Sequence, residues 1–129
     1  MASERQIGDS ADRFVLRLEE LKAELTDIRS ELASRNIIVL ADRCRRMLSD
    51  TRSLLDGNLN ALFASESPEV RTHLHSWLGY ADQQIATALS QDYDFEVILQ
   101  RLYMAALLAT HVQESMAGAI EDLKRRHLL

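Results

Sequence analysis

The sequence predicts an all-α fold: an antiparallel bundle of four helices, or of three if the first two are continuous. The 129 residues include one proline and four glycines, fewer than a β-sandwich or a Pro- or Gly-rich disordered chain requires. Apolar residues recur three and four positions apart over most of the chain, which puts them on one face of a helix. The predicted connections are short, so neighbouring helices run antiparallel. We predict a disordered tail over residues 1–8 and one helical-bundle domain over 9–129.

The composition narrows the class of protein. Hydrophobic residues make up 47% of the chain, too many for intrinsic disorder. The net charge of −5 disfavours general binding to nucleic acid or to an anionic membrane. The longest apolar run, residues 102–109, is too short to span a membrane. Cys44 is the single cysteine and the N-terminus is polar, so we expect a cytoplasmic protein.

The first predicted helix begins at Asp9 or Ser10, whose side chains can cap it. Its apolar residues alternate gaps of four and three, a heptad pattern typical of helices in coiled coils. The opposite face is charged, so another helix is expected to cover the stripe, either from this chain or from a second copy in a homodimer. The stripe consists of Phe14, Leu18, Leu21, Leu25, Ile28 and Leu32.

A second apolar stripe runs over residues 37–64. Either a turn at 34–36 separates it from the first helix, or one long helix changes its buried face there. The triplet Asp56-Gly57-Asn58 is a turn signal inside this segment, but the apolar spacing continues through it. We therefore predict a weak point and a kink at that triplet. The stripe consists of Ile37, Leu40, Cys44, Leu48, Thr51, Leu55, Leu59 and Leu62.

The third and fourth helices are predicted over residues 68–90 and 94–126. Ser67 can cap the third, and Pro68 suits its first position because no backbone N–H is needed there. Asp92 or Asp94 can cap the fourth. The basic run 124–126 favours the carboxyl end of the fourth helix through the helix dipole.

The sequence offers no catalytic, cofactor-binding or metal-binding residue. His73 and His75 stand two positions apart, so their rings point about 200° apart around a helix and cannot share one ion. Cys44 lies on an apolar stripe, where a thiol is usually inert. We expect no cofactor and no metal, and the residues favour a protein that is not an enzyme.

Two groups of residues are candidates for binding a partner. One is a basic cluster on the segment 37–64, which is either a docking patch for an acidic partner or a solvated face. The other is the pair His73 and His75 in the third helix. Trp77, the one tryptophan, is predicted to pack in the core. The basic candidates are Arg43, Arg45, Arg46 and Arg52.

Residues 63–81 resemble the H-box of sensor histidine kinases. That family reads Ser-His-Glu-Leu-Arg-Thr-Pro-Leu, followed by a tail of Ile or Leu, any residue, Gly, Tyr or Phe, and Ala. The family's phospho-accepting histidine falls on Pro68, and its proline falls on His73. The matching residues are Ser67, Glu69, Arg71, Thr72, Leu74, Gly79, Tyr80 and Ala81.

The resemblance implies a dimerising helical hairpin, formed by 68–90 and 94–126, that has lost phosphotransfer. In the family, the residue matching Glu69 assists phosphotransfer and the one matching Thr72 assists phosphatase chemistry. Neither role stands without the histidine.

Three functions follow from the sequence. The first is a non-enzymatic protein-interaction module, an adaptor, inhibitor or assembly subunit that binds another protein and also itself. The second is a regulator of two-component signalling derived from a kinase hairpin. The third is a helical enzyme or ligand carrier whose pocket forms only in three dimensions, with candidates His73, His75, His111, Tyr80 and Tyr103.

Overall fold

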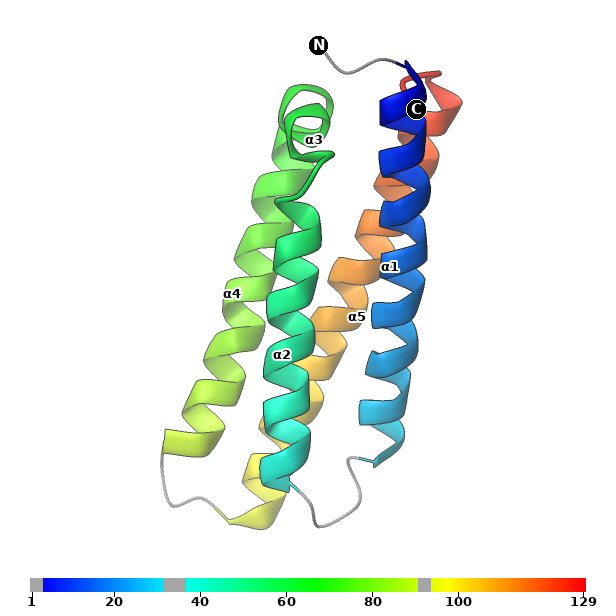
Figure 1. Ribbon diagram of the computed structural model, residues 1–129. Helices are drawn as coiled ribbons and strands as arrows, with labels where there is room; N and C mark the ends of the chain where they lie inside the picture. The colour runs from blue at the N-terminus through cyan, green and yellow to red at the C-terminus, as the bar shows by residue number, and fades with distance from the viewer. Residues whose placement is uncertain (1–3, 32–36, 91–93) are drawn as a thin grey trace.

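A computed structural model describes residues 4–31, 37–90 and 94–129. Within these ranges the chain forms helices and no strand, which confirms the all-α prediction (Figure 1). The helices are α1 (Glu4–Glu31), α2 (Ile37–Leu55), α3 (Asn60–Glu66), α4 (Pro68–Ser90) and α5 (Phe95–Arg125).

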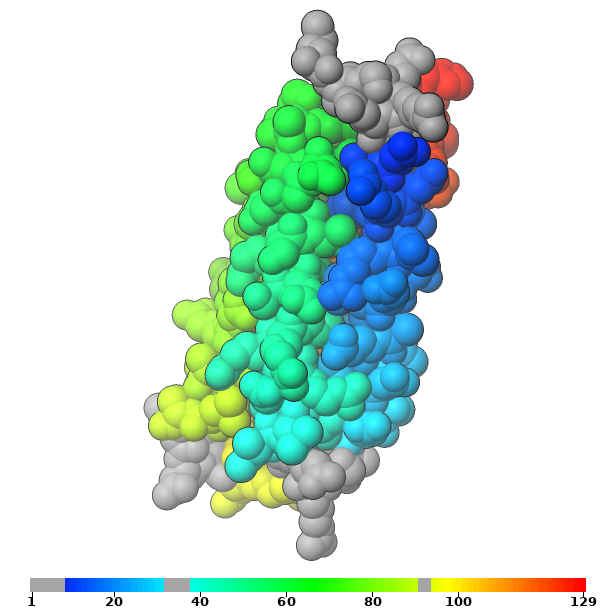
Figure 2. All heavy atoms as spheres, viewed as in Figure 1, coloured from blue at the N-terminus to red at the C-terminus, as the bar shows by residue number. Residues whose placement is uncertain are grey.

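Four long helices lie side by side, and the short α3 sits at one end between α2 and α4 (Figure 1). The helix α5 packs against α1, α2 and α4, whereas α1 lies diagonally across from α4. The side chains of α1 and α2 meet along the length of both helices (Figure 2). Each long helix therefore has one side on a shared core and another facing outward.

Polar contacts between helices give the direction of each pair. Arg17 of α1 pairs with Asp50 of α2 at 3.0 Å, and Glu31 of α1 pairs with Arg43 of α2 at 3.1 Å. The residue number rises along α1 while that of its partner falls, so the two helices run in opposite directions. The structure thus has α1 and α2 as separate helices, and the alternative of one continuous helix is wrong. The turn predicted at 34–36 lies outside the described residues.

The pair α4 and α5 is also antiparallel. Gln84 of α4 accepts a hydrogen bond from Arg101 of α5 at 2.9 Å. Nearer the start of α4, the ring centroid of His73 lies 6.3 Å from that of His111 on α5. These two contacts fix which residues of the two helices stand at the same level.

The first helix begins earlier than predicted. It starts at Glu4, so it includes five residues that the sequence assigned to the tail, and Asp9 and Ser10 lie inside it. No proline interrupts residues 4–8, and a helix that has already formed extends at little cost. The capping residues Asp9 and Ser10 therefore identified a position where a helix can begin, but the helix begins before them, at Glu4.

The predicted kink at residues 56–58 is a complete break. The helix α2 ends at Leu55 and α3 begins at Asn60, whose N–H donates to the Gly57 carbonyl at 3.0 Å. Leu59 and Phe63 nevertheless stay buried, because α3 folds over the end of the core. The apolar spacing continues through the break for that reason, and the prediction of one kinked helix was wrong.

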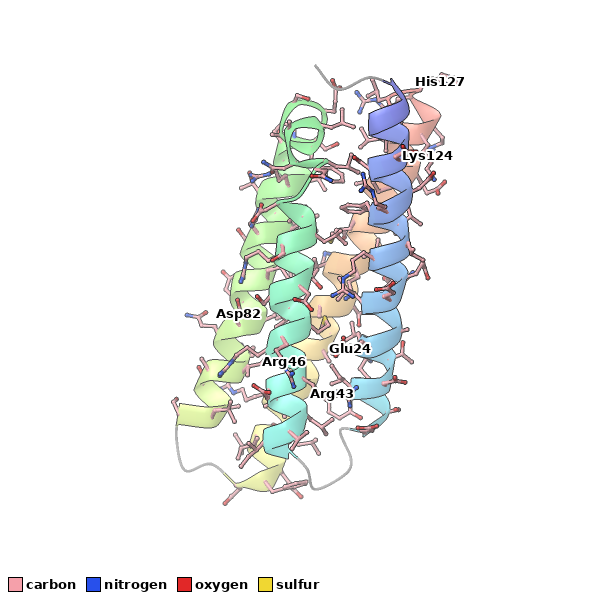
Figure 3. All side chains as sticks on the ribbon, in the orientation of Figure 1. Glu24, Arg43, Arg46, Asp82, Lys124 and His127 are labelled. Atoms are coloured by element: carbon pink, nitrogen blue, oxygen red, sulfur yellow. The ribbon has the colours of Figure 1, made fainter. Side chains whose placement is uncertain are left out.

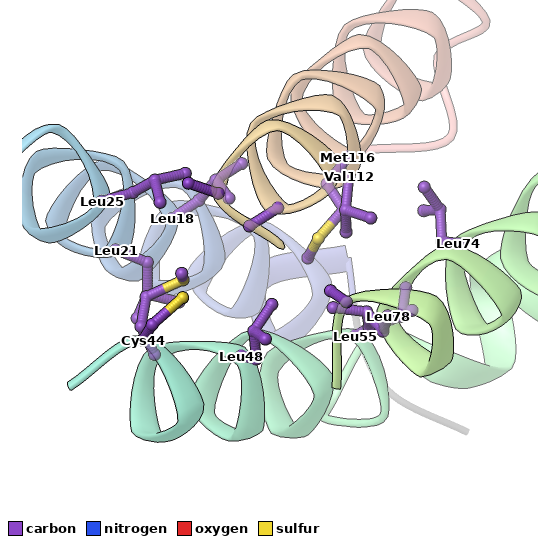
Figure 4. Close-up of a cluster of buried hydrophobic side chains, with 14 of the residues drawn as sticks. Leu18, Leu21, Leu25, Cys44, Leu48, Leu55, Leu74, Leu78, Val112 and Met116 are labelled. Carbon is purple, nitrogen blue, oxygen red and sulfur yellow. The ribbon is translucent and has the colours of Figure 1, made fainter. Parts of the chain in front are cut away.

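The predicted α1 and α2 stripes line the core where the structure describes their side chains. Side chains from α1, α2, α4 and α5 point toward one another there (Figure 4). The predicted α1 stripe from Phe14 to Ile28 is at most 4% exposed, and its partners are helices of the same chain. Helices of the same chain therefore cover that stripe. The fully buried large side chains are Leu21, Ile28, Leu40, Met47, Leu48, Leu55, Leu74, Leu78, Ile85, Leu102 and Met116.

One polar contact crosses the core between α2 and α5. Gln113, 1% exposed, donates from its side-chain amide toward the Met47 sulfur at 3.3 Å and the Thr51 hydroxyl at 3.5 Å. The Thr51 hydroxyl itself donates to the Met47 carbonyl at 2.8 Å. A buried amide needs such partners, so this contact favours one register of α5 against α2.

Cys44 is a buried, unreactive thiol. Burial, with a smaller effect from the Asp82 charge, raises the pKa of Cys44 from 9.0 to about 12. Because the folded pKa is the higher one, the protonated thiol stabilises the fold below pH 9, and that stabilisation is lost as pH rises toward 12.

We expect Cys44 to resist iodoacetamide in the folded protein. At pH 8 only about one buried thiol in ten thousand is ionised, against about one in ten after unfolding, so alkylation should be about a thousandfold slower. Mass spectrometry before and after addition of urea measures the difference. Equal rates in both states would contradict the buried position of Cys44.

Candidate functional site

Charged residues are unevenly distributed over the outer surface. Along α1 and α2 they are dense and form ion pairs within and between these helices. Between residues 72 and 90 the one charged residue is Asp82, and between 97 and 113 it is Arg101. Asp82 pairs with Arg52 of α2 at 2.6 Å, and Arg101 donates to Gln84. Over these two stretches the outward side of the α4–α5 pair is therefore almost without charge.

Large apolar and aromatic side chains occupy this uncharged side. On α4 they are spaced by three, four and three residues, and on α5 by three and four, so each set forms a stripe along its helix. The level set by the contacts Gln84–Arg101 and His73–His111 brings the two stripes together. We call this surface the α4–α5 outer face; it consists of Val70, His73, Trp77, Tyr80, Met104, Leu107 and His111.

Large side chains on this face are well exposed to solvent. Tyr80 is 58% exposed, Leu107 is 52% and Met104 is 49%. Apolar side chains are also exposed on the other helices, with Leu16 on α1 and Ile38 at the start of α2 among them. The α4–α5 outer face differs in joining such residues from two helices where charge is sparse, and a contiguous apolar patch marks a place of contact with something else.

Three rings form the centre of the face. The ring centroid of Trp77 lies 4.7 Å from that of His111 and 5.4 Å from that of His73. The Trp77 indole N–H donates to Nε2 of His73. Trp77 is half-buried and bridges the two helices, so its predicted place in the core is only partly right: one side packs inward and the other is open.

A groove of about 640 Å³ opens beside these rings, toward the end of the molecule where α4 begins. His73 and His111 lie at its edge, and Val70 and Leu74 form an apolar wall on α4. Its other wall belongs to α5 and carries small residues, Ser115, Gly118 and Ala119. A side chain added at Gly118 would meet nothing within 4 Å. The groove is hollow because α5 has no large side chain there.

The predicted basic cluster is not a single patch. Arg43 pairs with Glu31 on α1 and Arg46 pairs with Asp42 on α2, each at 3.1 Å. Arg52 reaches Asp82 on α4, so three of the four arginines lie beside a carboxylate. Figure 3 shows Arg43 and Arg46 along α2, with Asp82 on the neighbouring helix. Arg45 is exposed near the start of α2. These pairs favour the reading of a solvated face.

The two candidate histidines point to different sides of α4. His73 lies on the α4–α5 outer face, whereas Nε2 of His75 lies 2.9 Å from the Asp56 carboxylate near α2. Arg71 also contacts Asp56, at 3.3 Å, and its Nε donates to the Asn60 side chain at 2.6 Å. His75 therefore belongs to a group that ties the α2–α3 turn to α4.

Sequence reasoning missed Met104 and Leu107 as site residues and named Tyr80 and His111 only as candidates for an unseen pocket. Their signal was present in the run 102–109, which is apolar all around the helix. A helix of that kind is normally covered on every side. In this fold α5 is covered on its inner side alone.

Among the described residues, no three His, Cys, Asp or Glu side chains stand close enough to hold a metal ion. None of the described helices is both long and apolar enough to cross a membrane. No family model, no characterised protein and no solved structure matches the chain.

We expect neighbouring substitutions on α4 to separate the core from the outer face. Leu78→Ala should cost about 2–5 kcal/mol of unfolding free energy, because Leu78 is completely buried. Tyr80→Glu should change it by about 0.5 kcal/mol or less, since the Tyr80 side chain is mostly exposed. Urea denaturation followed by circular dichroism measures both. A Tyr80→Glu loss as large as that of Leu78→Ala would show that the face is part of the core.

Proposed function

We propose that the chain is a non-enzymatic protein-interaction module, an antiparallel four-helix bundle that binds another protein chain through the α4–α5 outer face. The observation that carries the proposal is the exposure of Tyr80, Met104 and Leu107 on two helix stretches, 72–90 and 97–113, that have one charged residue each. We place this role in the cytoplasm, a reducing compartment that suits a single buried thiol.

The residue types of the face support binding to protein. The centres of protein interfaces are depleted in charged residues and enriched in aromatic residues and Met. Trp and Tyr dominate binding energies because they bury a large, rigid surface at little cost in conformational entropy. Trp77, Tyr80 and Met104 provide these chemistries side by side.

The position of the face relative to the core also favours this function. Burial of apolar surface contributes about 25 cal/mol per Å² removed from water, and exposing Tyr80 and Leu107 forgoes that contribution in the single chain. A partner that covers them recovers it. The α1–α2 side also exposes apolar side chains, Leu16, Ile38 and Val39, but its other exposed side chains are mainly charged.

A second candidate is a regulator of two-component signalling. It is favoured by the antiparallel pairing of α4 and α5, the segments that carry the likeness to a histidine-kinase hairpin, and by the position of His73 on their outer face. Radiolabelled phosphoryl transfer from a kinase or a response regulator tests it. Absence of label on His73 and His75, together with absence of binding to such proteins, would exclude this function.

A third candidate is a small-molecule carrier that uses the groove beside His73 and His111. Its volume of about 640 Å³ is in the range of ligand sites. Titration of the chain with a library of small apolar molecules, read out by Trp77 fluorescence, tests it. A binder that Gly118→Leu abolishes would support this function, and no spectral change with any compound would exclude it.

We expect a photo-crosslinking amino acid at position 80 to capture protein in living cells. The same amino acid at Ala23, an exposed position on α1, should capture none, because charged residues surround it. Gel shifts after irradiation, followed by mass spectrometry, measure the adducts. Equal capture from both positions, or none from position 80, would contradict the proposed function.

A further inference from the structure

We propose that the occupant of the α4–α5 outer face is a second copy of this chain, related by a twofold axis that crosses the helices at right angles. This inference rests on the proposed function of the face and names its partner. It uses a different surface from the α1 stripe, which helices of the same chain cover.

The face carries a protrusion and a hollow of matching kinds. Tyr80 and Met104 project at the same level, since the contacts Gln84–Arg101 and His73–His111 bracket them. Val70, in the wall of the groove, lies ten residues from Tyr80 and therefore about 15 Å along α4. A surface that has both a protrusion and a matching groove can bind a second copy of itself. In an isologous dimer the protrusion of each copy fills the groove of the other.

The direction of the axis follows from these positions. An axis at right angles to the helices, near Ser76 on α4 and His111 on α5, exchanges the level of Tyr80 with that of Val70. Tyr80 and Met104 of one copy then enter the groove of the other. An axis parallel to the helices would place groove against groove and leave both hollow, so the perpendicular axis packs better.

The available area suits a dimer that depends on concentration. Two helices about 10 Å wide, in contact over about 25 Å, bury about 500 Å² on each copy and about 1,000 Å² in total. This total is at the lower end of specific interfaces. An apolar centre with Trp and Tyr makes an interface of that size effective.

The mass in solution tests the self-association. Sedimentation equilibrium of the purified chain should show a mass rising with concentration toward twice the 14.7 kDa of one chain. Emission from Trp77 should move to shorter wavelength over the same range as water leaves the face. Tyr80→Glu should weaken the dimer about tenfold or more, whereas Ala23→Glu on α1 should leave it unchanged.

Disulfide trapping tests the axis. With Cys44 buried and kept in place, Ser76→Cys should form a covalent dimer on mild oxidation, because the axis brings position 76 next to its own copy. Ser49→Cys on the exposed side of α2 should not. A mixture of Val70→Cys and Tyr80→Cys chains should give the mixed dimer in excess of either symmetric one.

The outcomes separate the two proposals. A purified chain that stays monomeric, while position 80 captures a different protein in cells, overturns the second copy and leaves the proposed function standing. A dimer that Tyr80→Glu does not weaken also overturns the inference. A dimer weakened by Tyr80→Glu in which Ser76→Cys does not crosslink overturns the perpendicular axis. A monomer without capture from position 80 overturns both proposals.

Discussion

The close packing of α4 against α5 is the constraint on which both the core and the candidate site depend. Ala81 on α4 and Ala105 and Ala109 on α5 are completely buried. Small side chains let two helix backbones approach closely, and they leave no room for a large residue between them. Tyr80, Met104 and Leu107 therefore lie on the outside of the pair. The packing that closes the core also builds the exposed apolar face.

The sequence predicted those features of the fold that have local causes. Pro68 begins α4, which suits its fixed backbone angle, and Phe95 begins α5 directly after Asp94, although the Asp94 side chain makes no capping hydrogen bond. The break between α2 and α3 has a cause that is not local. Leu55, Leu59 and Phe63 keep helical spacing on both sides of it, since a separate short helix buries the last two against the same core. Apolar periodicity indicates which residues are buried, and it does not show whether one helix is continuous. Here the buried residues keep their spacing, although the helix ends at Leu55.

The site was less predictable, for a related reason. When a helix is apolar all around, as over residues 102–109, its own pattern does not say which side the fold will cover. The positions of α1, α2 and α4 decide that. The basic cluster misled in the opposite way, because Glu31 and Asp82, which pair with Arg43 and Arg52, are distant in sequence. Arg43 and Arg52 therefore looked like free basic residues in the sequence, but each has an ion-pair partner on another helix.

The α1–α2 side and the α4–α5 side of the molecule consequently differ in the kind of contact that they favour. Charged residues on α1 and α2 find partners within the same chain, as Arg17 does with Glu20 and Asp50. Such a surface is well solvated, and the large apolar side chains that it exposes are Leu16, Ile38 and Val39. On α4 and α5 no ion pair joins the two helices in the described part of the chain, and their outward apolar residues have no cover. Contact on that side would remove apolar surface from water while stripping few charges of their hydration.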